Sequence, residues 1–357
     1  MGIENKILDF KNQQFYIGID VHKKNWNVTI RSGGIVLKTY STNASPKELN
    51  EYMRKKYPGG SYNSVYEAGF SGYWSHRELE TLGFKNIVVS PNDVPTNGKE
   101  KIYKTDSVDS RKLARELESG SIKGIYIPSQ LNQELRSLVR LRYQIMKSSV
   151  RLKNQIKSYL NFYGHKIPEN YETKHWSGIF INHLRSLSFQ YEMGKEQLEI
   201  YLSDLTGKRE LMVRTIKKIK TCCREYGFNE DIELLMKVPG IGFVTAVTLY
   251  AELMDIKRFA KLDNLSSYVG LSPAVISSGE KENTLGLKMQ HNKYLRILLV
   301  EAAWIAVRKD PALTASFNEY LKRMSKQEAI IRIAKKLLNR IRTVLKEKKE
   351  YVCSVVK

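Results

Sequence analysis

The segment FYIGID (residues 15–20) is an apolar run, rich in strand-forming residues, that ends in the carboxylate of Asp20. A second run, SVYE (residues 64–67), has the same form and ends in Glu67. Short apolar runs with β-branched and aromatic residues predict buried strands. We therefore expect two strands that each present an acidic side chain at one end.

The residues around these two runs predict the rest of a sheet. WNVTIR (26–31) and IVLKTY (35–40) flank a Gly-Gly pair, which is typical of a β-hairpin. A Ser-Pro-Lys-Glu capping box at residues 45–48 opens a helix, and IVVS (87–90) is a further short strand. A hairpin followed by strand–helix alternation predicts a mixed sheet covered by helices, an α/β domain over residues 1–128.

Two acids three residues apart follow this pattern. The segment TDSVDSRKLA (105–114) contains Asp106 and Asp109, and we expect Asp106 to cap a helix over residues 107–118. Residues three apart lie on one helical face, so their charges repel each other unless a cation is bound. Magnesium prefers oxygen ligands, and two ions about 4 Å apart need a bridging carboxylate, a role that suits Asp20.

Acids from two strand ends and one helix predict a divalent-metal site for phosphoryl transfer. Its expected ligands are Asp20, Glu67, Asp106 and Asp109. Surface charges or helix caps are the alternative reading of the same four positions.

The composition indicates what such a site would act on. The chain has 357 residues, with 59 Lys and Arg against 37 Asp and Glu, a net charge of +22. A protein this basic usually binds a polyanion, and nucleic acid comes before a membrane surface because no lipidation motif or strongly apolar amphipathic segment is present. The three cysteines, without zinc-ligand spacing, and the lack of a signal or membrane-spanning segment predict a cytoplasmic protein.

Long helices are expected beyond residue 128. Apolar residues recur at intervals of three and four over residues 135–159 and again over 198–219. This spacing predicts a helical arm over residues 129–230. Two arrangements stay open, a coiled coil that pairs with itself or with another subunit, and an ordinary helical bundle. Residues 231–357 are expected to be mainly helical.

The segment LLMKVPGIGFVTA (234–246) has the signature of a helix-hairpin-helix. Gly240 and Gly242 would let backbone N–H groups approach a phosphate at the start of the second helix, and Lys237 adds positive charge. A tight turn that only packs is the alternative. Further along, Ser278 precedes Gly279 in a polar segment that we expect to be a loop, ahead of a basic helix with Arg296. Such a serine could be a nucleophile, although Ser-Gly is also ordinary turn chemistry.

Taken in order, these motifs resemble those of one family. They are YIGIDVHK (16–23), Glu67, the Asp106–Asp109 pair, VPGIG (238–242), and GLSP (270–273) through Ser278 to LVEAA (299–303). The chain is similar over nearly its whole length to the DEDD transposases of the insertion sequence 110 family, the bridge-RNA-guided serine recombinases related to Piv-type DNA invertases. The resemblance implies an N-terminal RuvC-like (RNase H fold) domain over 1–128, a coiled-coil arm over 129–230, and a helical transposase domain over 231–357.

The resemblance also implies roles for individual residues. The four acids correspond to the family's DEDD set, which binds magnesium, with manganese as a substitute. Ser278 corresponds to the serine that forms a phosphoserine linkage with DNA, and the adjacent Ser277 is its alternative. The implied partners are double-stranded donor and target DNA, a structured guide RNA and further copies of the chain, as a dimer or a synaptic tetramer associated with the nucleoid.

Several expectations remain open from the sequence. Lys23, Lys24, Lys237 and Arg296 are the candidates for contacts with the nucleic-acid backbone. A RuvC-like nuclease or junction resolvase that uses water would leave Ser278 without a role. A site-specific DNA invertase would share the chemistry without a guide RNA, and an architectural nucleic-acid-binding protein would have no catalytic role for the acids.

Overall fold

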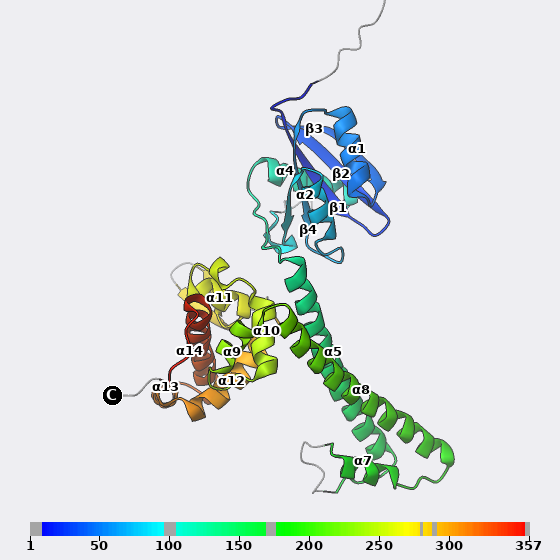
Figure 1. Cartoon of the computed structure of the whole chain (residues 1–357), viewed down its shortest axis with the longest axis vertical. Coiled ribbons are helices and arrows are strands. Elements are labelled where there is room, and N and C mark those ends of the chain that lie inside the picture. The colour runs from blue at the N-terminus through cyan, green and yellow to red at the C-terminus, as the bar shows by residue number, and fades with distance from the viewer. Residues whose placement is uncertain (1–8, 96–104, 169–175, 279–280, 288–290, 354–357) are drawn as a thin grey trace, which may run out of the picture. The chain divides into compact units, whose positions relative to one another are not determined.

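The computed structural model describes residues 9–95, 105–168, 176–278, 281–287 and 291–353. The chain divides into two compact units, Met1–Ile127 and Pro128–Lys357 (Figure 1). The predicted arm and the predicted C-terminal domain both lie in the second unit.

The first unit is built on the predicted mixed sheet. Its strands are β1 (Gln14–Val21), β2 (Asn25–Ser32), β3 (Ile35–Asn43), β4 (Ser61–Glu67) and β5 (Lys85–Val89), in the order β3-β2-β1-β4-β5. The hairpin β2–β3 and its partner β1 are antiparallel, whereas β1, β4 and β5 run parallel. The prediction of an α/β domain with a mixed sheet is confirmed.

Helices cover both faces of this sheet. They are α1 (Pro46–Lys56), α2 (Trp74–Thr81), the short 3-10 helix η1 (Pro91–Asp93) and α4 (Asp106–Glu118). Consecutive strand residues point to opposite faces of a sheet. On one face, Tyr66 shares an apolar cluster with Leu49 of α1 and Leu79 of α2. On the other face, Val65 shares a cluster with Leu113 of α4. The helix α4, which carries two of the predicted acids, therefore lies on the face opposite α1 and α2.

Helix α4 rests directly on β1 at Gly18. A Cβ atom at Gly18 would lie 2.1 Å from the backbone oxygen of Ser110 and 2.4 Å from the backbone nitrogen of Ala114. The hydroxyls of Ser110 and Thr29 form a buried hydrogen bond of 2.8 Å beside this contact. The lack of a side chain at residue 18 thus sets the distance between β1 and α4.

The start of α4 differs from the prediction. The N-cap is Thr105, in an extended conformation, and Asp106 is the first helical residue. Asp106 is therefore not the cap, because its carboxylate accepts a hydrogen bond from Asn27 of β2 instead of from the first turn of its own helix.

The second unit begins with the two predicted long helices. Helix α5 (Gln130–Phe162) and helix α8 (Glu192–Glu225) contact each other, and α7 (Gly178–Arg185) joins them in a separate apolar cluster (Figure 1). Each helix contains one of the predicted apolar runs, 135–159 in α5 and 198–219 in α8, and extends beyond it at both ends. Their assignment as a coiled coil stays a prediction.

The rest of the second unit is helical around one large apolar core. Its helices are α9 (Asn229–Met236), α10 (Phe243–Leu253), η2 (Ile256–Arg258), α11 (Leu262–Val269), α12 (Leu295–Lys309), α13 (Pro311–Leu321) and α14 (Lys326–Glu347). No helix among the described residues is both long and apolar enough to cross a bilayer.

A two-stranded hairpin interrupts these helices. Its strands β6 (Pro273–Ser278) and β7 (Lys281–Leu287) are antiparallel, so the expectation of a polar loop at Ser278 is wrong. The β-branched residues Val275, Ile276 and Thr284 favour extended backbone here, and pairing between the strands satisfies it.

A fully buried carboxylate ties the segment after this hairpin to α5. Glu252 of α10 accepts hydrogen bonds from Arg140 Nε at 2.6 Å and Nη2 at 2.8 Å, and from Asn292 Nδ2 at 2.8 Å. Charged groups are retained in a protein interior when they are paired and hydrogen-bonded in this way. The network joins α5, α10 and the residues that follow β7.

Replacing Gly18 by alanine tests the contact between β1 and α4. We expect Gly18→Ala to lower the free energy of unfolding by about 3 kcal/mol, because the new methyl group meets backbone atoms that cannot move aside alone. Chemical denaturation would measure the change. The matched control is Gly69→Ala, where a Cβ would meet only the Glu67 oxygen at 4.0 Å; similar losses in both variants would contradict the close contact.

Replacing Glu252 by glutamine tests the buried network. We expect Glu252→Gln to destabilise the chain by about 3 kcal/mol, since it leaves the Arg140 charge without its buried partner. The control Glu199→Gln breaks an exposed pair with Arg185 and should change stability by less than about 1 kcal/mol. Equal losses of unfolding free energy in the two variants would count against a structural role for the buried pair.

Candidate metal centre

The four predicted acids come from three elements of the first unit. Asp20 is the penultimate residue of β1, and Glu67 is the last residue of β4. Because β1 and β4 are parallel neighbours, with Ile19 paired to Tyr66, these two acids lie at the same edge of the sheet. Asp106 and Asp109 occupy the first turn of α4, which packs on β1.

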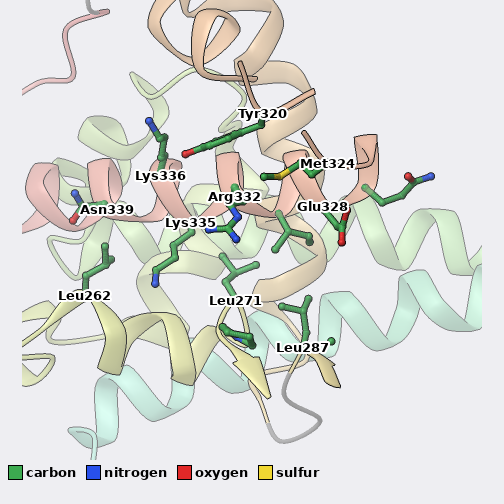
Figure 2. A pocket seen from close by; sticks show the side chains of 14 residues that line it. Leu262, Leu271, Leu287, Tyr320, Met324, Glu328, Arg332, Lys335, Lys336 and Asn339 are labelled. Carbon is green, nitrogen blue, oxygen red and sulfur yellow. The ribbon is translucent and has the colours of Figure 1, made fainter. Parts of the chain in front are cut away.

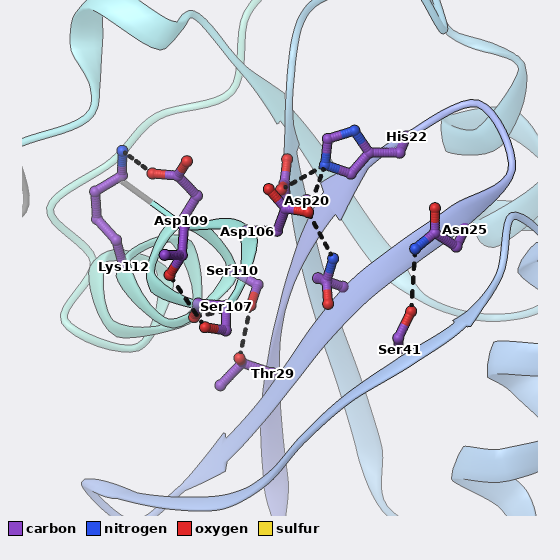
Figure 3. Close-up of polar contacts among 12 residues, drawn as sticks. Asp20, His22, Asn25, Thr29, Ser41, Asp106, Ser107, Asp109, Ser110 and Lys112 are labelled. Atoms are coloured by element: carbon purple, nitrogen blue, oxygen red, sulfur yellow. Dashed lines mark hydrogen bonds and ion pairs between the residues drawn. The ribbon is translucent and has the colours of Figure 1, made fainter. Parts of the chain in front are cut away.

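One half of the site contains Asp20, Asp106 and His22. Figure 3 shows the His22 ring beside the two carboxylates, with the same Nε2 atom at 3.0 Å from Asp20 Oδ2 and 3.3 Å from Asp106 Oδ2. One ligand atom from each of the three residues lies within 4.8 Å of the others. This is an arrangement that one metal ion could occupy.

The other half contains Glu67, Asp109 and Lys112. The Lys112 ammonium lies 3.6 Å from Glu67 Oε1 and 3.4 Å from Asp109 Oδ1. Its side chain is only 9% exposed, one helical turn beyond Asp109 (Figure 3). These two carboxylates therefore already face a positive charge supplied by the chain.

Electrostatics connect the two halves at Asp20. Burial raises the pKa of the Asp20 carboxyl, the neighbouring His22 opposes that rise, and the charges of Asp106 and Asp109 add to it. An acid whose charged form is disfavoured by burial and by like charges gains most from a bound cation.

The donor set fits a hard divalent ion. Carboxylate oxygens suit magnesium, and manganese accepts the same oxygens together with an imidazole nitrogen. The sequence analysis identified the four acids but missed His22 and Lys112. His22 lies two residues after Asp20, and Lys112 one turn after Asp109, so the available signal was proximity in sequence to residues already selected.

The predicted nucleic-acid-binding residues have varied surroundings. Lys23 and Lys24 are exposed in the β1–β2 turn beside His22, and Lys237 is exposed at the end of α9. Gly242 is the N-cap of α10, and a Cβ there would meet nothing within 4 Å. These four positions can be approached by a ligand.

Gly240 and Arg296 are packed against the protein itself. Gly240 has a φ of +85°, and a Cβ there would lie 2.3 Å from the Ala302 backbone oxygen of α12. The Arg296 guanidinium lies close to Gly270, where a Cβ would be 2.6 Å from Nη2, and burial lowers the pKa of Arg296. Both residues take part in packing within the second unit.

Ser278 also belongs to the second unit, separate from the acids. It is the last residue of β6 and pairs with Lys281 of β7, while Ser277 pairs with Glu282. The serine predicted as the nucleophile therefore lies at the end of a hairpin strand.

A pocket of about 840 Å³ lies near the base of that hairpin, within the second unit (Figure 2). Leu262, Leu271, Leu287 and Met324 give it apolar walls, and Arg332, Lys335 and Lys336 of α14 bring positive charge to it. Lys335 is paired with Asp263 at 2.9 Å, and Lys336 donates to Ser316 Oγ at 3.1 Å. The lining thus combines apolar surface with cations.

Two protein-family models match the chain. A DEDD transposase model matches residues 17–165, which include the four acids, His22 and Lys112. A second model, described as transposase of the IS116/IS110/IS902 family, matches residues 232–318, which include Ser278. The mixed sheet with helices on both faces is consistent with a RuvC-like domain of this kind.

Curated relatives agree with these matches. The chain is 26% identical to a putative transposase, y4qE, of Sinorhizobium fredii over 82% of this chain and 72% of the relative. It is 26% identical to the transposase for insertion sequence element IS1111A of Coxiella burnetii, over 77% and 74% of the two chains. It is also 26% identical to the transposase for insertion sequence element IS1533 of Leptospira borgpetersenii, over 82% and 85%.

Replacing Asp20 by asparagine tests the metal centre. In metal-free buffer at neutral pH, we expect Asp20→Asn to melt no lower than the parent chain, because a carboxyl with a raised pKa opposes folding once it is ionised. Any excess of the Tm of Asp20→Asn over that of the parent chain should vanish as the pH falls below 3.8, the usual pKa of an aspartate, because the parent carboxyl is then protonated in both the folded and the unfolded chain. Manganese should raise the Tm of the parent chain but not that of the variant, as differential scanning calorimetry would show.

The exposed Asp93→Asn serves as the matched control for this measurement. Its Tm should rise with manganese as much as that of the parent chain. A manganese response that survives Asp20→Asn would exclude Asp20 as a ligand.

Proposed function

We propose that the chain is a DEDD transposase of the IS110 family and that it cuts and rejoins DNA strands with magnesium through a phosphoserine intermediate. The observation that carries the proposal is the acidic cluster at the ends of β1 and β4 and the start of α4. This cluster falls inside the segment matched by the DEDD model.

Asp20, Asp106 and His22 would hold the divalent cation, with Glu67 and Asp109 completing the acidic set. When bound, the cation polarises the scissile phosphate and balances the negative charge that develops on it. The protein residues fix where that charge can lie, because they come from a sheet edge and a helix packed on it.

Ser278 would supply the nucleophile. Its Oγ forms a bond to phosphorus while the bond from phosphorus to the 3′ oxygen breaks, and the serine proton is transferred to the departing 3′ oxygen. In the rejoining step, a 3′ hydroxyl from the partner strand attacks the phosphoserine and restores the serine. Support comes from the resemblance around Ser278 and from its position at the end of β6, with Ser277 as the neighbouring alternative.

The proposed partners are double-stranded donor and target DNA, a structured guide RNA, and further copies of the chain in a dimer or a synaptic tetramer, acting in the cytoplasm on the chromosome. A net charge of +22 supports polyanion binding. Lys23, Lys24, Lys237 and Gly242 are the proposed backbone contacts, since they are open to solvent or to a ligand.

A second candidate function is strand hydrolysis by water. It is favoured by one observation: all four acids lie in the first unit, whereas Ser278 lies in the second. A RuvC-like nuclease or resolvase would need only the first set of residues.

Serine substitution separates the two functions. With magnesium, donor and target DNA and RNA transcribed from the flanks of the gene, the parent chain should form a covalent protein–DNA adduct that resists denaturation. Ser278→Ala should abolish the adduct and reduce recombination about 10³-fold or more, because it removes the oxygen that forms the proposed linkage.

Ser277→Ala is the matched control and should retain the adduct. Cleavage that persists in Ser278→Ala without an adduct would establish the hydrolytic function instead. Recombination that is unchanged after ribonuclease treatment would exclude a guide RNA.

A further inference from the structure

Lys112 is a buried cation on the inner side of α4. The residues of this helix that are buried with it include Ser110, Leu113 and Ala114, which face the sheet. A lysine is rarely buried in such a position, because an ammonium loses its hydration there unless anions surround it. In this structure the anions are Glu67 and Asp109, both within 3.6 Å of Nζ.

The two halves of the acidic site are therefore unequal. Among the described residues, the group able to hold an ion consists of Asp20, His22 and Asp106, and it includes neither Glu67 nor Asp109. A second divalent ion bound by Glu67 and Asp109 would lie within a few ångströms of the Lys112 ammonium. Like charges at such distances repel strongly where water is scarce. The four acids by themselves predict a site for two divalent ions, but the charge of Lys112 disfavours binding of the second ion.

We propose that the Lys112 ammonium acts as a resident cation between Glu67 and Asp109, so that the chain binds one divalent ion, at Asp20, Asp106 and His22. The inference rests on the proposed metal centre and specifies how that centre is charged. The ammonium is a permanent part of the fold, whereas the divalent ion exchanges with solvent.

This arrangement gives the two positive charges different properties. The divalent ion is held by an exposed half of the site, in which His22 and Asp106 have side chains that are 44% and 57% exposed. The lysine approaches its anions from the interior, along α4. Lys112 is thus a positioning residue for Glu67 and Asp109, keeping two carboxylates that would otherwise repel each other at a fixed separation.

Counting bound ions tests the proposal. Metal-free full-length protein is titrated with manganese, and the free ion is measured by electron paramagnetic resonance. We expect one manganese per parent chain and two per chain in Lys112→Gln, because removal of the ammonium frees Glu67 and Asp109 as ligands. Two ions in the parent chain, or one in a folded Lys112→Gln, would overturn the inference.

Control variants separate charge from position. Lys112→Arg keeps the charge and should bind one ion. Arg111→Gln removes one positive charge from the exposed side of the same helix and should also bind one. A second ion in Arg111→Gln would mean that general charge, rather than Lys112, limits the count.

Two further variants in the parent background cover the case in which Lys112→Gln does not fold. Glu67→Gln should still bind one ion, because Glu67 is not its ligand, whereas Asp20→Asn should bind none. Loss of the ion in Glu67→Gln would overturn the inference. A parent chain that binds no manganese would overturn the proposed metal chemistry together with this inference. Two bound ions, with magnesium-dependent strand cleavage, would overturn only the role of Lys112 and leave the metal chemistry intact.

Discussion

The contact between Gly18 and the backbone of α4 is the constraint on which the first unit depends. It places the first turn of α4 beside the end of β1, and this is what brings Asp106 and Asp109 to acids that precede them by many residues in the chain. Any side chain at residue 18 would hold the helix away from the sheet. The acidic site is therefore a consequence of close packing as much as of its own ligands.

Close packing of acids creates a second constraint, because carboxylates at one sheet edge repel one another. The chain offsets this repulsion with two of its own side chains, His22 on one side and Lys112 on the other. The second unit handles its buried carboxylate in the same way, with Arg140 and Asn292 around Glu252. Glu252 is fully buried, whereas the acids of the first unit are only partly so, but in both units the carboxylates are accompanied by hydrogen-bond donors or positive charges from the chain itself.

The sequence was sufficient for features set by local pattern. Periodicity and turn residues predict the hairpin β2–β3, the strands that end near Asp20 and Glu67, and the presence of two long helices at α5 and α8. Long-range contacts decided the rest. Asp106 is not a cap because Asn27 of another strand reaches it, and Lys112 is buried because Glu67 lies opposite. The β6–β7 hairpin was missed because its short strands lie among helices, where Ser-Gly indicated a loop.

The Glu252 network also has an evolutionary consequence. Arg140, Glu252 and Asn292 lie far apart in the chain, yet each supplies a group that the other two require in a buried setting. A descendant that lost the Glu252 carboxylate would keep a guanidinium without its ion-pair partner, and one that lost Arg140 would keep a buried carboxylate without its partner. The three positions should therefore change together among descendants of this sequence, as a single inherited unit that spans the helix α5, the helix α10 and the segment after the hairpin.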